Sequence, residues 1–354
     1  MTAIQSRQTG AALSIATIIV VIFGMQAAKV LLVPFLLAIF LALITVRPML
    51  WMQRRRVPAV LAVLLIVVTM VLLLSGIAAI LGTSIADFTA ALPGYQARLN
   101  VITAQTLELA ARFVDDGDAI ENLGDLIDPG WAMGLAANLL NGLREVLTNA
   151  FLILFTMVFI LLEASGFSTK FRAAFGRRNE TFVQAQRFLQ NLGRYLGIKT
   201  VVSIATGLTA GLLTHWIGLD FPLLWAMFAF LLNYIPTIGS IIAAVPAVLL
   251  ALVQLGPGEA AATALAFLGI NVVFGTIIEP RLMGHGVGIS PLVVFLSLVF
   301  WGWVFGPVGM LLSVPLTMTL KMALESNPDT RWLAIIIGPE RDAQFALQSR
   351  AEVV

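Results

Sequence analysis

The stretch from 221 to 255, FPLLWAMFAFLLNYIPTIGSIIAAVPAVLLALVQL, decides the fold. It contains no charged residue, so it is suited to lipid rather than to the surface of a soluble protein. As one helix it would be about 50 Å long, whereas the hydrocarbon core of a bilayer is about 30 Å thick. The run must therefore fold back, and Ile235-Pro236-Thr237-Ile238-Gly239 is where proline and glycine break the helix.

A second run, 291–320, is also too long for one crossing and has a similar break at Gly306-Pro307-Val308-Gly309. Two prolines of the first run, Pro222 and Pro246, recur 69 residues later at the same spacing. This offset predicts a repeated broken-helix hairpin, an arrangement that transporters place near the bilayer midplane. Chance matches between two apolar stretches are the alternative.

Composition extends this conclusion to the whole chain. Of 354 residues, 59% are hydrophobic and 11% are charged, against about 25% charged in an ordinary soluble domain. The mean hydropathy is +0.97. We therefore predict an all-α, polytopic helical membrane protein with about eight transmembrane segments and two broken-helix hairpins in its C-terminal half. The other predominantly apolar runs are roughly 11–28, 30–46, 58–83, 148–165, 198–217 and 260–278.

Charge divides the chain into four parts. Residues 1–83 form the N-terminal membrane segments with three spans, and 84–147, which holds nine of the nineteen acidic residues, is an extracytoplasmic amphipathic helical domain. Residues 148–321 are a C-terminal membrane block with a basic, aromatic cytoplasmic segment at 166–199, where helices would lie on lipid. Residues 322–354 are a cytoplasmic tail.

The clustering of arginine and lysine sets the orientation, because positive loops stay in the cytoplasm. Arg54, Arg55 and Arg56 follow the second run. Only Gln26 to Val30 separates the first two runs, and we expect a tight hairpin there that leaves both termini cytoplasmic. One long helix, with the N-terminus outside, is the alternative.

Polar residues inside apolar runs are the candidate functional residues, because each is costly in lipid unless partnered. Asn271 and Glu279 lie about 80° apart around an α-helix, near one face. Glu279 would bind a proton or cation and Arg281 would orient it; a plain interfacial helix end is the alternative. The first break frees backbone groups that would line a path or be satisfied by neighbouring helices. The predicted transport path comprises Asn233, Pro236, Thr237, Gly239, Asn271, Glu279, Arg281, Gly306 and Gly309.

Enzymatic chemistry has little support. The chain has two histidines and no cysteine, and it contains no HExxH, Walker or G-x-S-x-G motif. We expect no catalytic residue, no cofactor and no metal site. The basic residues are too sparse for nucleic acid, so membrane lipids and a small polar solute or ion are the expected partners.

Several motifs together resemble the autoinducer-2 exporter-like family of bacterial membrane proteins. They are Asn233-Tyr234-Ile235-Pro236-Thr237-Ile238-Gly239, Glu279-Pro280-Arg281-Leu282-Met283-Gly284, Gly288-Ile289-Ser290-Pro291-Leu292-Val293, Gly306-Pro307-Val308-Gly309 and Val314-Pro315-Leu316. Their order and spacing are similar to the family's over nearly the full length. Ile289-Ser290-Pro291 departs from the commoner Leu-His-Pro pattern, so a proton role for a histidine does not carry over.

The resemblance implies a transporter of the bacterial inner membrane that assembles as a homo-oligomer, a pentamer in the family. Some members export a small furanone quorum-sensing signal, and others resemble sodium/proton antiporters. The expected function is a secondary transporter that exports a small polar solute such as an autoinducer-2-like signal, coupled to a proton or sodium gradient. The alternative is a membrane scaffold or channel-like assembly organised by residues 84–147.

Overall fold

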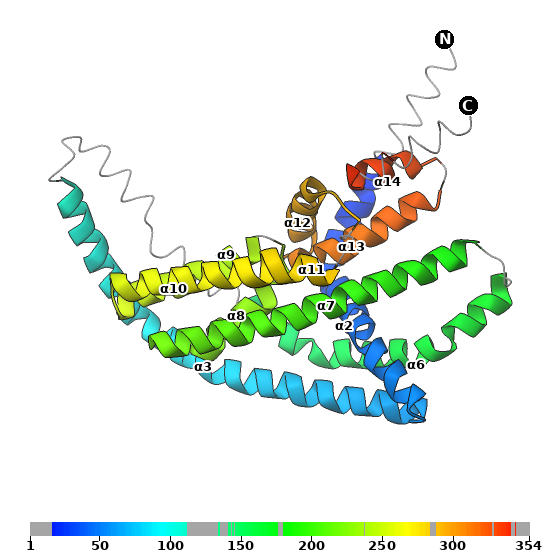
Figure 1. Cartoon of the computed structure of the whole chain (residues 1–354), viewed down its shortest axis with the longest axis horizontal. Coiled ribbons are helices and arrows are strands. Elements are labelled where there is room, and N and C mark those ends of the chain that lie inside the picture. Colours follow the sequence, from blue (N-terminus) through cyan, green and yellow to red (C-terminus); the bar gives the residue numbers. More distant parts are fainter. Residues whose placement is uncertain are drawn as a thin grey trace, which may run out of the picture. The chain divides into compact units, whose positions relative to one another are not determined.

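A computed structural model describes residues 16–111, 146–175, 180–236, 238–283, 288–327 and 329–340, with a few isolated residues besides (Figure 1). Within these ranges the regular structure is helical. A short helix at Ala16–Ala27 precedes the labelled ones. These are α2 (Lys29–Arg54), α3 (Ala59–Ala111), α6 (Ala150–Phe175), α7 (Glu180–Ile217), α8 (Pro222–Leu232), α9 (Ile238–Gln254), α10 (Pro257–Ile270), the π-helix η1 (Asn271–Ile278), α11 (Glu279–Met283), α12 (Pro291–Phe305), α13 (Pro307–Glu325) and α14 (Arg331–Ile337).

The prediction of a polytopic helical membrane protein is confirmed. Among the described residues, five helices are long and apolar enough to cross a bilayer: Lys29–Arg54, Ala59–Ser84, Ala185–Ile217, Pro257–Met283 and Pro307–Glu325. Shorter apolar helices, the two legs of the first hairpin among them, accompany these spans. The chain is therefore a multi-pass membrane protein.

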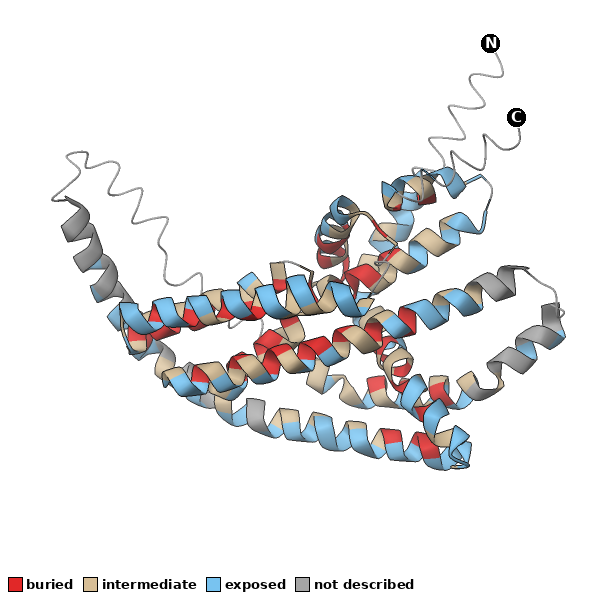
Figure 2. Ribbon diagram, viewed as in Figure 1, coloured by how far each residue is buried: buried red, intermediate tan, exposed pale blue. Residues whose placement is uncertain are grey.

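Large apolar side chains are exposed along these helices. Val60 is 68% exposed, Phe151 79% and Trp216 78%. Figure 2 shows how much of α3 and α10 is uncovered by the rest of the protein. In water such surfaces would be a liability, whereas lipid covers them at no cost.

The predicted tight hairpin after residue 26 is wrong. One turn residue, Ala28, separates Ala16–Ala27 from α2. The amide of Ala28 donates to the carbonyl of Gly24 at 3.0 Å, and the Ala28 carbonyl accepts from Leu32 at 2.9 Å. Helical hydrogen bonds thus continue through the junction, and a chain that keeps them does not reverse. A reversal at this junction therefore does not bring the N-terminus back to the side of Arg54, Arg55 and Arg56.

Two predicted polar segments begin as extensions of membrane helices. α3 continues without interruption to Ala111, so the part of 84–147 that the structure describes starts as an extension of the span. The basic segment 166–199 is not a separate surface helix in its described part, because α6 runs to Phe175 and α7 starts at Glu180.

The chain divides into two compact units, each described by itself. Unit 1 comprises 1–67, 149–186 and 289–354, and in it α2 packs on α6 around Met49 and Met157, both fully buried. Unit 2 comprises 68–148 and 187–288, with α7 to α11 as its framework.

Both predicted hairpins are present at the predicted breaks. In unit 2, α8 ends at Leu232 and α9 begins at Ile238 and packs back on α8. In unit 1, α12 and α13 are joined by Gly306 alone, whose φ of 70° and ψ of −151° suit only glycine.

A second glycine brings the legs of each hairpin together. A Cβ added to Gly239 would collide with the carbonyl group of Leu232 on the first leg, and one added to Gly309 would collide with that of Trp301. The absence of a side chain lets the two backbones touch. The two hairpins therefore share the same local construction, which fits the predicted repeat.

Candidate functional site

The membrane part of α7 carries a polar face inside unit 2. Lys199, Ser203 and Thr206 follow one another at spacings of four and three residues, so they lie on one side of the helix. They are 4%, 0% and 6% exposed. A buried polar stripe in a membrane helix is retained against a cost in free energy, and it marks a candidate site.

An ion pair joins this face of α7 to the helix Pro257–Met283 of the same unit. The Nζ atom of Lys199 lies 2.7 Å from both Oε1 and Oε2 of Glu279. The Lys199 side chain is 5% exposed and that of Glu279 16%. Tyr195, one turn before Lys199, is near enough to interact electrostatically with Glu279. Within the described residues this is an ion pair held between two membrane-spanning helices, α7 and the helix Pro257–Met283.

The α8–α9 hairpin is called hairpin 1 and the α12–α13 hairpin is called hairpin 2. The break of hairpin 1 is bonded to the same face of α7. The Nδ2 group of Asn233 donates to Oγ of Ser203 at 2.8 Å. The hydroxyl of Tyr234 donates to Oγ1 of Thr200, also at 2.8 Å. The end of α8 is therefore fastened to α7 by neutral hydrogen bonds just beyond the ion pair.

The carboxylate is positioned by a π-helix. η1 runs from Asn271 to Ile278, and the amide of Glu279 donates to the carbonyl of Phe274, five residues back. The carboxamide of Asn271 lies against Gly275, where a Cβ would be 2.9 Å from its Oδ1. The predicted 80° between Asn271 and Glu279 assumed α-helical geometry and does not apply here. π-Helical segments often occur at functional sites.

Close packing of α7 on α8 holds the site together. A Cβ on Gly207 would lie 2.7 Å from the carbonyl oxygen of Ala226, and one on Gly211 would lie 2.8 Å from the Cβ of Ala226. Small residues four apart let two membrane helices approach closely. Trp225 and Phe228 fill the interior of α8 and are 0% and 1% exposed.

The predicted path residues are divided between the two units. Asn233, Pro236, Gly239, Asn271 and Glu279 belong to unit 2, as does Arg281, whereas Gly306 and Gly309 shape the turn of hairpin 2 in unit 1. Thr237 lies outside the described residues. The prediction that Arg281 orients Glu279 is wrong, because Lys199 binds both carboxylate oxygens and Arg281 is exposed.

The bend of hairpin 1 is closed in this conformation. Tyr234 and Ile235 are 6% and 5% exposed, and Gly239 is buried. The amide of Ile235 donates to Leu232 and that of Ile238 to Pro236. These two amides are satisfied by carbonyl groups of the same hairpin. Any solute that passes this point requires the hairpin to move.

A second polar cluster lies beyond the membrane part of α3. The Tyr95 hydroxyl donates to Oδ2 of Asp220 at 2.8 Å, between α3 and the turn before α8. Burial and the neighbouring Asp220 carboxylate raise the pKa of Tyr95 to about 12. The Asp220 amide donates to Oε1 of Gln254, and Nε1 of Trp225 donates to the Asp220 carbonyl. This outer clamp ties α3, the start of α8 and the end of α9 together.

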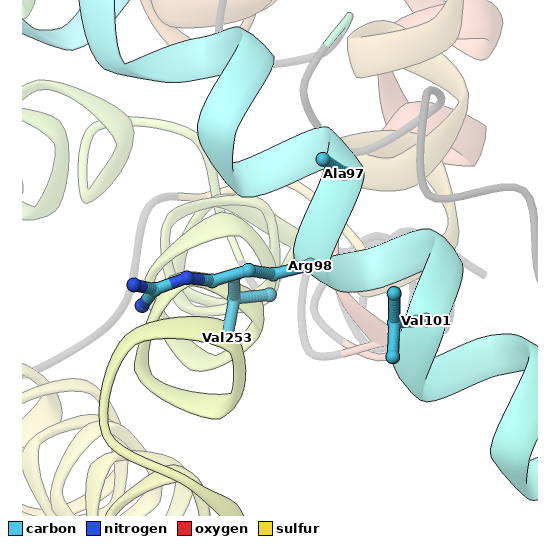
Figure 3. A pocket seen from close by; sticks show the side chains of 4 residues that line it. All are labelled: Ala97, Arg98, Val101 and Val253. Atoms are coloured by element: carbon cyan, nitrogen blue, oxygen red, sulfur yellow. The ribbon is translucent and has the colours of Figure 1, made fainter.

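Beside the clamp is a shallow recess of about 400 Å³. Ala97, Arg98 and Val101 of α3 line it together with Val253 of α9, and Figure 3 shows Arg98 reaching across toward Val253. Its walls are mostly apolar and it opens widely to the outside, so it offers few groups that could fix a ligand.

Sequence analysis missed Lys199 and Ser203. Lys199 was placed in a cytoplasmic loop because it stands at the boundary of an uncharged run, but it lies inside α7 and is buried. The regular spacing of Lys199, Ser203 and Thr206 along the helix was the available signal. The partner of Lys199 is 80 residues away and could not be read from spacing.

Comparison with known proteins identifies the family. A sequence model described as AI-2E family transporter matches residues 14–329. The AI-2 transport protein TqsA of Escherichia coli K12 is 41% identical over 321 residues, which cover 90% of this chain and 93% of TqsA. A Haemophilus influenzae protein is 38% identical over 93% of this chain and 96% of its own length, and YhhT of Escherichia coli K12 is 35% identical over 93% and 94%. The chain belongs to the AI-2E family of transporters.

Proposed function

We propose that this protein is a secondary transporter that exports a small polar solute of the autoinducer-2 type, and that the solute passes the polar face of α7. Family membership and the name of TqsA support the class of solute. The path runs along Lys199, Ser203 and Asn233, where α7, the break of hairpin 1 and the π-helical segment meet.

The observation that carries the proposal is the ion pair between Lys199 and Glu279. Two charges in the interior of a membrane protein cost several kcal/mol in desolvation unless they are well paired. Such charges therefore often mark functional sites. Here a salt bridge joins two spans next to a broken helix, which gives the protein a bond that can be made and opened in a transport cycle.

We propose that this pair couples transport to a proton or sodium gradient. The Glu279 side chain is 16% exposed and that of Lys199 5%, so a cation that enters from water reaches the carboxylate first. A proton or sodium ion on Glu279 would release Lys199 and weaken the link between α7 and the helix Pro257–Met283. The closed bend of hairpin 1 could then separate from Ser203 and admit the solute.

The proposed setting is the bacterial inner membrane. The arginines of the α2–α3 turn, Arg54, Arg55 and Arg56, would face the cytoplasm together with the C-terminal tail. We propose a homo-oligomer, as the family resemblance implies, and transport without enzymatic chemistry.

The test is flux through the purified protein in vesicles. Efflux of autoinducer-2 would be measured with no gradient, with a proton gradient and with a sodium gradient, for the wild type and for Glu279→Gln. The wild type should transport, and Glu279→Gln should lose the response to the gradient. Glu163→Gln is the matched control, because Glu163 is paired with Lys170 at an exposed position. An unchanged gradient response in Glu279→Gln would remove Glu279 from coupling, and no flux with any gradient would contradict the proposed function.

A further inference from the structure

Thr206 differs from the three other threonines in the membrane part of α7, Thr200, Thr209 and Thr214. The hydroxyls of Thr200, Thr209 and Thr214 each donate to the backbone carbonyl four residues earlier, at 2.7–2.8 Å. The Thr206 hydroxyl is completely buried and has no hydrogen-bond partner among the described residues. A helical threonine usually satisfies itself on its own backbone, so Thr206 keeps a donor and an acceptor unused.

The position of Thr206 connects this unused hydroxyl with the proposed path. It lies three residues after Ser203, where side chains of a helix are neighbours. Ser203 accepts the hydrogen bond from Asn233 at the break of hairpin 1. Two hydroxyls, one and two turns beyond Lys199, and a carboxamide at the bend therefore lie on this side of α7, and one of the hydroxyls lacks a partner among the described residues.

We propose that Ser203, Thr206 and Asn233 form a subsite that binds a hydroxyl group of an uncharged solute. The inference rests on the proposed function, since it names what the same path recognises. Leaving a buried hydroxyl unpaired is unfavourable, and a solute hydroxyl that both donates and accepts a hydrogen bond would remove this penalty. The Asn233–Ser203 bond occupies the subsite while no solute is bound.

The charges around the subsite favour an uncharged ligand. The three groups are neutral, so they give an anion or a cation no counter-charge of their own. Lys199 repels a cation, and Glu279 already neutralises Lys199 for an anion. Hydrogen bonding is the interaction left for recognition, and a polar site of this kind discriminates strongly against analogues that lack the matching group.

The experiment compares Thr206→Val with Thr209→Val in the purified full-length protein. Valine keeps the shape of threonine and removes the hydroxyl. Binding of autoinducer-2, D-ribose and tetrahydrofuran would be measured by calorimetry, together with the Tm of each variant. Thr206→Val should have a Tm equal to or above that of the wild type, because it removes a buried hydroxyl that makes no bond. It should bind the hydroxylated ligands about tenfold more weakly, as the loss of one hydrogen bond implies. Thr209→Val should leave binding unchanged.

Each outcome decides one of the two proposals. Equal affinity of the wild type and Thr206→Val for hydroxylated ligands would overturn the subsite, and so would absence of any binding in the wild type. Binding of tetrahydrofuran as strong as that of D-ribose would also overturn it. If Thr206→Val weakens binding while the wild type shows no flux in vesicles, the subsite is supported and the proposed transport function fails.

Discussion

Removing either partner of the ion pair between Lys199 and Glu279 should destabilise the protein, but by different amounts. In Glu279→Leu the Lys199 ammonium stays in a position where its side chain is 5% exposed. Removal of one partner from a buried pair costs about 3–5 kcal/mol, so we expect this variant to lose stability in that range. In Lys199→Met the remaining carboxylate is 16% exposed. It is less buried than Lys199, so the expected loss is smaller, about 1–3 kcal/mol, as for an unsatisfied polar group.

The double variant Lys199→Met/Glu279→Leu should recover most of the lost stability, because apolar residues often replace a buried pair without loss. Lys170→Met is the control, since the pair Lys170–Glu163 is 70% and 56% exposed and contributes about 0–1 kcal/mol. The assay is reversible unfolding of the protein in mixed micelles by a denaturing detergent, followed by circular dichroism. Equal losses for the two single variants, or a double variant as unstable as Glu279→Leu, would refute the argument from burial.

Three further predictions test other parts of the structure. Gly239→Ala should unfold at a lower Tm than Gly258→Ala, because a Cβ at Gly239 meets the Leu232 carbonyl and one at Gly258 meets nothing within 4 Å; equal Tm values would mean that the legs of hairpin 1 are not in contact. Tyr95→Phe should open the outer clamp and make α3 more susceptible to limited proteolysis. In the wild type the Tyr95–Asp220 hydrogen bond should hold below about pH 10 and be lost as the pH rises through the Tyr95 pKa of about 12. Identical cleavage of both proteins would contradict this. A single cysteine placed before residue 16 of the cysteine-free chain should react with an impermeant thiol reagent from the side of the membrane opposite Arg55. Labelling from the same side as Arg55 would show that the chain reverses between this cysteine and Arg55.

The class of fold and the two bends could be predicted because they depend on local composition. An uncharged run that is too long for the bilayer must bend, and proline and glycine show where. The breaks at Pro236 and Gly306 are observed where the sequence placed them. The junction at Ala28 was predicted wrongly because length alone argued for a reversal, whereas the backbone keeps its helical hydrogen bonds there.

The partners within the site could not be predicted, since they depend on which helix faces which. Arg281 stands two residues from Glu279 and was the natural partner by sequence, but Lys199 on another helix is the one that binds it. The π-helix before Glu279 has no simple sequence signal and changes which residues share a face. Tertiary packing therefore decided the site, while local sequence decided the fold.

The central claim, that solute passes the buried polar face of α7, is tested most directly by the reactivity of Ser203→Cys in reconstituted vesicles. Ser203 is 0% exposed here, whereas Leu208 on the same helix is 63% exposed on an apolar face. A small, charged, water-soluble thiol reagent should modify Ser203→Cys only while a gradient drives transport, saturating autoinducer-2 should slow the reaction, and Leu208→Cys should stay unmodified in lipid. A Ser203→Cys protein that transports at the wild-type rate but is never modified from either side would show that the solute crosses elsewhere.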